Sequence, residues 1–219
     1  MPFCRLDHLA IAAATLEQGV AYLEEQLGVT VPQGGKHPLM GTHNRLMQLG
    51  PDAFLEIIAI DPDADQPARP RWFHLDDPIV QALIAQQPRL LTWVVRTDDI
   101  EAATKASPIA VGEIKEGRRG DLVWQITVPK DGSMPEDGLF PTLIQWPDSL
   151  MPNGPASNMA DLGCTLESLH IAHTDPERFG TALGAIGAGG LAEIDTASEE
   201  IPPGLTAWIT SPKGRVALR

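Results

Sequence analysis

Two residues with ionisable side chains stand in segments that are otherwise apolar. His8 lies in the predicted strand at residues 6–11, and Glu56 lies in the apolar run at residues 53–60. An ionised carboxylate buried there costs several kcal/mol unless a cation or several hydrogen-bond donors meet it. An imidazole and a carboxylate together suit zinc, iron, manganese or nickel. The alternative is an internal His–Glu hydrogen bond that only stabilises the sheet.

The chain repeats one local pattern three times, and this pattern positions both residues. Each repeat begins with a short apolar strand, near residues 6, 91 and 166, and continues into a capped helix. Thr15 begins a capping box, and Asp175 followed by proline caps the third helix. Hairpins follow the helices, so the unit is strand–helix–strand–strand–strand and about 60 residues long. The helix covers one face of the sheet, and the other face needs a second unit or a ligand.

The repeats divide the chain into three modules and two connecting segments. Asp77 and Pro78 predict the start of a helix that runs to Gln86 within the first connecting segment. The second connecting segment is rich in proline, asparagine, glycine and serine, which is typical of a surface linker. The predicted divisions are a first βαβββ module at 1–62, a connector at 63–89, a second βαβββ module at 90–148, a linker at 149–165 and a third, partial module at 166–219.

The first and last strands of one unit are able to pair, which would bring His8 and Glu56 together on the concave face. Alignment of the first two units places Thr92 at the position of His8 and Gln145 near the position of Glu56. An amide oxygen binds a cation more weakly than a carboxylate, and threonine is a poor ligand for a transition metal. The predicted metal ligands are therefore His8, Glu56 and Gln145, with water or Thr92 in the remaining space.

Three stretches resemble a known family: LDHLAI at residues 6–11 with the capped helix after it, FLEII at 54–58, and GGKHPLMGTHN at 34–44. The first two resemble a module of the vicinal oxygen chelate superfamily, which includes glyoxalase I, extradiol dioxygenases, methylmalonyl-CoA epimerase and bleomycin-resistance proteins. The third resembles its glyoxalase-like domain branch. The resemblance covers residues 5–148 and is weak beyond residue 165.

The resemblance implies an α+β fold in which two βαβββ modules form a curved half-barrel pair around a cavity. It also implies metal ligands on the first and last strands of each module. His8 and Glu56 match these positions in the first module. In the second module Thr92 replaces the usual histidine, and Gln145 replaces the usual glutamate.

Further polar residues are candidates for contact with a substrate. His43 and Asn44 lie on opposite faces of a predicted strand that enters the cavity, and His43 would also serve as a base near neutral pH. An arginine such as Arg71 would clamp a carboxylate with two hydrogen bonds. The alternatives are a solvated edge strand and an arginine that offsets nearby acids. The predicted catalytic residues are Glu56 and His43, and the predicted substrate contacts are His37, Thr42, Asn44, Thr92 and Arg71.

Composition excludes several classes of partner. Acidic residues outnumber basic ones 29 to 16 among 219 residues, a formal net charge of −13, whereas nucleic acid and anionic membranes need a basic surface. The sequence contains neither an apolar run of about 18 residues nor a signal peptide. Two distant cysteines predict reduced thiols in a cytoplasmic protein. No dinucleotide or P-loop fingerprint occurs, so no nucleotide cofactor is expected.

Two functions stay open at this point. One is an enzyme, dependent on a divalent metal, that acts on a small carbonyl or vicinal-oxygen substrate by lyase, isomerase or dioxygenase chemistry. The other is a metal-free protein of the bleomycin-resistance type that binds or sequesters a small molecule. The third module has no partner within its own repeat. It either packs on the first two modules or mates with the same module of a second chain, which would form a homodimer.

Overall fold

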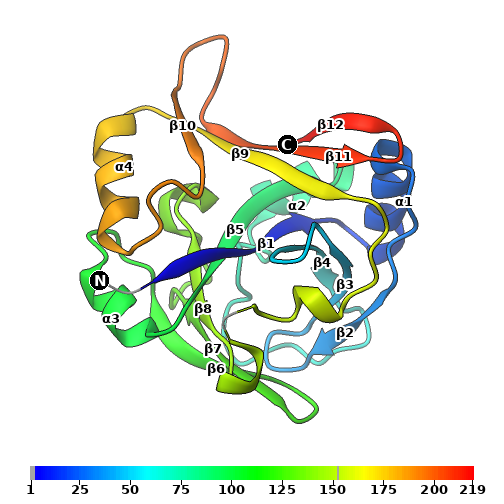
Figure 1. Cartoon of the computed structure of the whole chain (residues 1–219). Coiled ribbons are helices and arrows are strands. Elements are labelled where there is room, and N and C mark those ends of the chain that lie inside the picture. The colour runs from blue at the N-terminus through cyan, green and yellow to red at the C-terminus, as the bar shows by residue number, and fades with distance from the viewer. Residues whose placement is uncertain (1–2, 152) are drawn as a thin grey trace.

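Eight strands form one curved sheet in the order β2-β3-β4-β1-β5-β8-β7-β6 (Figure 1). The computed structural model describes residues 3–151 and 153–219. In chain order the strands are β1 Cys4–Ala12, β2 Gln33–His37, β3 Thr42–Gln48, β4 Phe54–Ile60, β5 Arg89–Thr97, β6 Glu113–Arg119, β7 Leu122–Val128 and β8 Thr142–Gln145. β1 pairs in parallel with β4, and β5 pairs in parallel with β8. Antiparallel pairing of β1 with β5 joins the two halves. The predicted pair of βαβββ modules is confirmed.

Each α-helix of the described residues begins at a side chain that caps its first turn. The caps are Thr15, Asp77, Asp99 and Asp175, and each accepts a backbone N–H from the helix that follows. The helices are α1 Leu16–Leu27, α2 Pro78–Gln86, α3 Ile100–Ala106 and α4 Pro176–Ala185, with short 3-10 turns η1 Pro135–Gly138, η2 Asp148–Leu150 and η3 Ala156–Asn158. None of these helices is long and apolar enough to cross a membrane.

The third repeat forms a separate sheet that lies across the outer face of the first (Figure 1). Its strands are β9 Thr165–His173, β10 Glu193–Thr196, β11 Gly204–Ser211 and β12 Gly214–Leu218. The chain order of elements is again βαβββ, but the spatial order is β10-β9-β11-β12. The first and last strands are therefore not neighbours, in contrast to the first two modules. The third module packs on the other two within one chain, and a homodimer stays a prediction.

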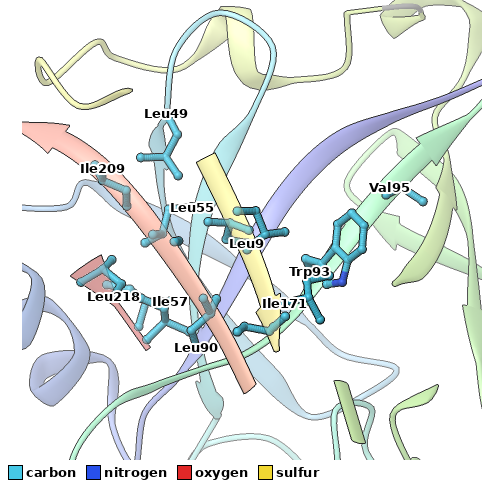
Figure 2. Close-up of a cluster of buried hydrophobic side chains, with 14 of the residues drawn as sticks. Leu9, Leu49, Leu55, Ile57, Leu90, Trp93, Val95, Ile171, Ile209 and Leu218 are labelled. Atoms are coloured by element: carbon cyan, nitrogen blue, oxygen red, sulfur yellow. The ribbon is translucent and has the colours of Figure 1, made fainter. Parts of the chain in front are cut away.

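The main core lies between the two sheets (Figure 2). Leu9 of β1 and Ile57 of β4 are fully buried there, against Ile209 of the second sheet and its neighbours. Because side chains alternate along a strand, the other face of β1 and β4 carries His8 and Glu56. The packing of the core thus turns both residues toward the concave side of the eight-stranded sheet.

Helix α1 approaches β4 closely at a glycine. A Cβ atom at Gly19 would lie 2.3 Å from the Cγ2 atom of Ile57. We expect Gly19→Ala to lower the free energy of unfolding by about 1–3 kcal/mol, because overpacking forces the helix or Ile57 to shift. Urea denaturation measures this change. Gly184→Ala in α4 is the matched control, since a Cβ there meets no atom within 4 Å, and an equal loss in both variants would contradict the packing argument.

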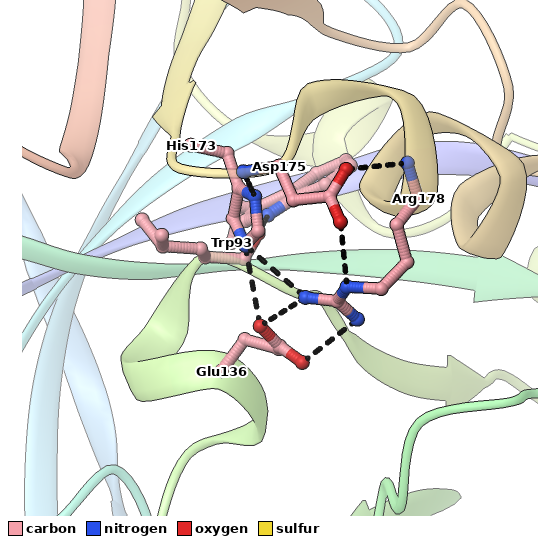
Figure 3. Close-up of polar contacts among 6 residues, drawn as sticks. Trp93, Glu136, His173, Asp175 and Arg178 are labelled. Carbon is pink, nitrogen blue, oxygen red and sulfur yellow. Dashed lines mark hydrogen bonds and ion pairs between the residues drawn. The ribbon is translucent and has the colours of Figure 1, made fainter. Parts of the chain in front are cut away.

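A polar cluster ties α4 to the segment before β8 (Figure 3). His173 is buried at the end of β9, and its ring stacks on Phe179 with ring centroids 4.5 Å apart. Its Nδ1 atom accepts the backbone N–H of Asp175 at 2.9 Å, and its Nε2 atom lies 3.2 Å from the Oε2 atom of Glu136. Arg178 donates to both oxygens of Glu136, at 3.2 and 3.0 Å. His173 therefore belongs to a structural cluster that joins the third module to the second.

Candidate functional site

The connector between the first two modules packs against the concave face of the eight-stranded sheet. Trp72, Phe73 and Leu75 are buried there in a second apolar cluster with side chains of β4, β7 and α2. Phe73 and His74 have φ angles of 58° and 53°, a left-handed conformation that costs non-glycine residues about 1–3 kcal/mol. The backbone N–H of His74 donates to Gly132 at 2.8 Å, which holds this turn in place. The turn brings two aromatic rings close to His8 and Glu56.

A β-bulge brings Asp7 and His8 side by side. In the pairing of β1 with β5, Leu6 stands opposite Val95 and His8 stands opposite Val94, so Asp7 is left without a partner residue. A bulge re-aims side chains that regular alternation would separate. The Oδ1 atom of Asp7 accordingly lies 2.7 Å from the Nδ1 atom of His8.

The carboxylate of Asp7 is fully buried and held at both oxygens. Its Oδ2 atom accepts the indole N–H of Trp146 at 2.8 Å, and an Nη1 atom of Arg96 lies 3.7 Å from the same oxygen. Arg96 also donates to the backbone oxygens of Leu6 and Asp52 at 2.7 Å each. Donors on both oxygens and a buried cation stabilise the carboxylate as an anion. Asp7 thereby fixes the ring of His8, with Nδ1 bound and Nε2 directed at Glu56.

Glu56 meets His8 from the neighbouring parallel strand. The Nε2 atom of His8 lies 3.5 Å from the Oε2 atom of Glu56, and both side chains are about nine-tenths buried. The other oxygen, Oε1, accepts an N–H of Asn44 at 2.7 Å, and the Oδ1 atom of Asn44 accepts the backbone N–H of Gly35 at 2.7 Å. The structure therefore brings the predicted pair together and adds the predicted contact Asn44 to it.

His37 extends this line of polar contacts. Its Nε2 atom lies 3.3 Å from the Nδ2 atom of Asn44, and its Nδ1 atom lies 3.1 Å from the hydroxyl of Thr42. Burial lowers the pKa of His37, so the ring is neutral at neutral pH. Lys36 and His37 belong to strand β2, because they pair with His43 and Thr42 of β3.

Burial and charge act in opposite directions on the pKa values of the central pair. Burial favours the neutral form of His8, but the hydrogen bonds to Asp7 and Glu56 and the charges of both carboxylates outweigh it and raise the pKa of His8 to about 9. Burial also favours the neutral form of Glu56, but the hydrogen bond to His8 and its charge outweigh that effect and hold the pKa of Glu56 below its ordinary value. Without a metal, the pair at neutral pH is an imidazolium next to a carboxylate.

The pair lines a pocket with about 470 Å³ of space free of protein atoms, part of which is open to solvent. Phe54, Trp72, Phe73, Trp124 and Ile144 form its apolar walls. The ring of His8 stacks on Phe54 with centroids 4.5 Å apart. A concave, mostly apolar site with a few converging polar groups is typical of small-molecule pockets.

Comparison with known proteins agrees with this architecture. A family described as glyoxalase-like domain matches residues 6–187. The chain belongs to the glyoxalase-like domain family. The predicted resemblance to the glyoxalase-like domain branch is thus confirmed. No curated protein matches the sequence significantly.

Solved structures are similar to this glyoxalase-like domain at low sequence identity. A hypothetical protein from Staphylococcus aureus matches with a TM-score of 0.57 and 13% identity over 98% of this chain and 84% of that chain. Methylmalonyl-CoA epimerase from Mycobacterium tuberculosis matches with a TM-score of 0.45 and 19% identity over 67% of this chain and 90% of that chain. The match to the Staphylococcus aureus protein covers 98% of this chain and therefore includes the third module.

Two predicted residues of the glyoxalase-like domain lie away from the pocket walls. His43 points to the opposite face of β3 from Asn44, and its Nδ1 atom lies 3.9 Å from the Oδ1 atom of Asp61. Thr92 is fully buried opposite Ala10 of β1, and its hydroxyl approaches the backbone oxygen of Trp93 at 3.4 Å. Strand alternation explains His43, because Asn44 takes the concave side.

Gln145 also lies apart from His8 and Glu56. Its amide oxygen accepts the backbone N–H of Ile100 at 2.8 Å, so the side chain binds the start of α3 on the outer face. His8 lies opposite Val94, and Ile144 lines the pocket from β8. By strand register, Val94 and Ile144 therefore stand where the first module has His8 and Glu56. Alignment on the helix caps placed Thr92 two residues from Val94, and alignment on the strand ends placed Gln145 one residue from Ile144.

Two other predicted contacts have structural partners. The guanidinium of Arg71 is buried, lies 2.6 Å from a carboxylate oxygen of Asp76, and approaches the backbone oxygen of Gly41 at 3.4 Å. It therefore anchors the connector. Thr42 supports the ring of His37. Sequence reasoning missed Asp7, because regular alternation places it on the face opposite His8, and no residue type signals the bulge.

His8 and Glu56 would fill two coordination positions of a single divalent cation. Among residues 3–151 and 153–219, no group of three or more His, Cys, Asp and Glu side chains is placed to hold a metal ion. His8 and Glu56 nevertheless supply an imidazole and a carboxylate that face each other. A carboxylate on the second ring nitrogen, as Asp7 provides, is the usual support of a metal-binding histidine. Two protein donors fit an ion whose remaining positions are filled by water or substrate.

The raised pKa of His8 predicts a loss of stability at alkaline pH. The folded state binds this proton more tightly than the unfolded state, so the contribution is complete below about pH 6.5 and is lost as the pH rises through about 9. For chelator-treated protein we expect the free energy of unfolding to fall by roughly 1–3 kcal/mol across this window. Denaturation at a series of pH values measures the fall. His8→Gln should remove it, and His170→Gln on the outer sheet should not.

Proposed function

We propose that this glyoxalase-like domain is an enzyme that moves a proton on a small carbonyl compound, by isomerase or lyase chemistry. The observation that supports this proposal is the array Asp7–His8–Glu56, which places a cationic N–H and a carboxylate 3.5 Å apart in the wall of an apolar pocket. Perturbed titratable groups that meet in a pocket are typical of catalytic sites.

The two groups have complementary roles. The carboxylate of Glu56 takes a proton from the carbon next to the carbonyl, and the electron pair of that C–H bond forms a C=C bond while the carbonyl electrons move to oxygen. The N–H at Nε2 of His8 donates to that oxygen as negative charge develops on it. Return of the proton to the same carbon with inverted configuration completes an epimerisation. In a 2-hydroxy aldehyde, the hydroxyl proton moves to the former carbonyl oxygen and the abstracted proton returns to the former carbonyl carbon, so that the carbonyl and hydroxyl groups exchange places. Where the carbon on the far side from the carbonyl bears a leaving group, the enolate re-forms the carbonyl and a new C=C bond while that group departs with its electron pair, which completes an elimination.

Other residues position this pair. Asp7 holds the ring of His8 from Nδ1, and Asn44 holds Glu56 by one oxygen, so that Oε2 stays available. Trp72 and Trp124 cover the pocket with apolar surface, which strengthens the electrostatic interactions inside it.

The fold family implies a divalent metal such as zinc, iron, manganese or nickel, and the donors present are compatible with one. His8 through Nε2 and Glu56 through Oε2 would hold the ion, which would supply Lewis-acid polarisation of a carbonyl oxygen. An ion and a proton compete for Nε2 of His8, so metal affinity should rise with pH.

Proton exchange with solvent tests the proposal. Small 2-oxo acids, 2-hydroxy aldehydes and phenylpyruvate are incubated in D2O with the protein, first after chelation and then with added zinc or manganese. Proton NMR follows the replacement of C–H by C–D next to the carbonyl. We expect the wild type to accelerate exchange of at least one probe and His8→Gln to lose this activity. Rates equal to those of buffer for every probe in both states would refute the proposal.

A metal-free binding protein is the second candidate, and the second-module positions favour it. Val94 and Ile144 contribute only apolar surface where a second pair of ligands would stand. Quenching of tryptophan fluorescence by phenylpyruvate, without exchange of its C–H protons and without stabilisation by divalent metals, would support this candidate over the enzyme.

A further inference from the structure

Three adjoining hollows connect the buried pair with the surface. The pocket at His8 and Glu56 shares Trp72 and Trp124 with a narrower hollow of about 280 Å³. It also shares Arg119 with an open cleft of about 980 Å³ at the ends of β2 and β6. A ligand bound at the pair therefore has room to extend toward Arg119.

Arg119 differs from the other cations of this cleft. Lys36 lies 2.7 Å from a carboxylate oxygen of Asp61, and Arg118 lies 3.3 Å from one of Glu116. The side chain of the half-buried Arg119 has neither an ion pair nor a hydrogen bond among residues 3–151 and 153–219. Its side chain crosses β2 at Gly35, where a Cβ atom would lie 2.6 Å from the Cδ atom of Arg119. The absence of a side chain at Gly35 makes room for the guanidinium.

A second donor in the same pocket also lacks a partner. Trp72 is 6% exposed, and its indole Nε1 atom has no hydrogen-bond partner within the described parts of the chain. A buried donor left unpaired costs about 1–3 kcal/mol, and native structures rarely leave one without a reason. A ligand oxygen in the pocket would supply the missing acceptor.

We propose that the pocket recognises the carboxylate of its ligand through Arg119 and pairs a further ligand oxygen with the indole N–H of Trp72. The ligand is then a small carbonyl acid with an apolar or aromatic body, which lies between Arg119 and the His8–Glu56 pair. One guanidinium matches the single charge and planar oxygens of a carboxylate. The inference that the ligand carries a carbonyl group rests on the proposed function. The inference that its carboxylate binds Arg119 does not depend on that function and is tested by binding alone.

Binding of three matched probes tests the assignment without turnover. The probes are phenylpyruvate, its methyl ester and the acylphosphonate of the same skeleton, and quenching of tryptophan fluorescence gives the dissociation constants. We expect the wild type to bind phenylpyruvate about 10- to 100-fold more tightly than the ester. Arg119→Gln should abolish this preference, and Arg118→Gln should keep it. Trp72→Phe keeps an aromatic ring without the N–H and should weaken phenylpyruvate binding several-fold.

Four outcomes would overturn the assignment. Equal affinity for acid and ester in the wild type, or a preference that survives in Arg119→Gln, shows that Arg119 does not read the carboxylate. Tighter binding of the acylphosphonate assigns the site to phosphoryl groups. Absence of binding of all three probes up to roughly 10 mM excludes this ligand class. A preference for the acid without any proton exchange leaves this inference standing and refutes the proposed enzyme.

Discussion

Replacing Asp7 by alanine is expected to lower the free energy of unfolding by about 3–5 kcal/mol. The substitution removes a buried carboxylate that lies 3.7 Å from the Nη1 atom of Arg96 and that accepts the N–H groups of His8 and Trp146. Breaking a buried network of charges and hydrogen bonds is among the most destabilising changes that a single substitution makes. Urea or thermal denaturation of the metal-free protein measures the loss.

Asp63→Ala is the matched control for Asp7→Ala. The carboxylate of Asp63 is 84% exposed and lies 3.6 Å from the ammonium of Lys36, so its removal should cost less than about 1 kcal/mol. Asp7→Asn keeps the volume of the side chain and one acceptor oxygen. Its loss in the free energy of unfolding should therefore lie between those of Asp7→Ala and Asp63→Ala. A loss for Asp7→Ala as small as that for Asp63→Ala would show that Asp7 is not the anion on which this site depends.

Replacing Glu56 by glutamine is expected to reduce proton exchange on a carbonyl probe by about 10²- to 10⁴-fold. Glutamine keeps the length of the side chain and an oxygen for the N–H of Asn44, but it cannot accept the proton from carbon. The fold should therefore persist while the reaction is lost. Exchange rates at saturating probe, followed by NMR in D2O, measure the effect.

Glu136→Gln is the matched control for Glu56→Gln. This residue bonds Arg178 and His173 on the outside of the eight-stranded sheet, away from the residues that line the pocket. Its substitution should lower stability modestly and leave the exchange rate within about twofold of the wild type. An unchanged rate in Glu56→Gln would assign the base to another group.

Much of the fold is predictable from short patterns in the sequence. Thr15 and Asp175 cap their helices as predicted, and the helix from Pro78 to Gln86 forms where Asp77 and Pro78 predict it. These features depend on contacts within a few residues, so the local sequence contains the whole cause. The third module shows the limit, because nothing in its sequence indicates that β9 pairs with β10 on one side and with β11 on the other.

The candidate site was predictable where regular geometry applies. Alternation and parallel pairing of β1 with β4 were enough to bring His8 and Glu56 together. The bulge at Asp7 and the left-handed turn at Phe73 are irregular, and each depends on contacts with distant strands and loops. Gln145 was misplaced because a shift of one residue along a strand moves a side chain to the other face.

The central claim is that Asp7 and Glu56 hold a charged imidazole in a pocket that binds a carbonyl compound. Nitrogen-15 NMR of protein labelled at histidine tests it most directly, with His8→Gln to assign the signals. For metal-free protein we predict that His8 stays protonated on both ring nitrogens at neutral pH and titrates with a pKa of about 9. We also predict that its ring signals shift when phenylpyruvate or another carbonyl probe binds. A His8 that titrates near the ordinary value of 6.5, with ring signals unmoved by every carbonyl probe, would contradict the account.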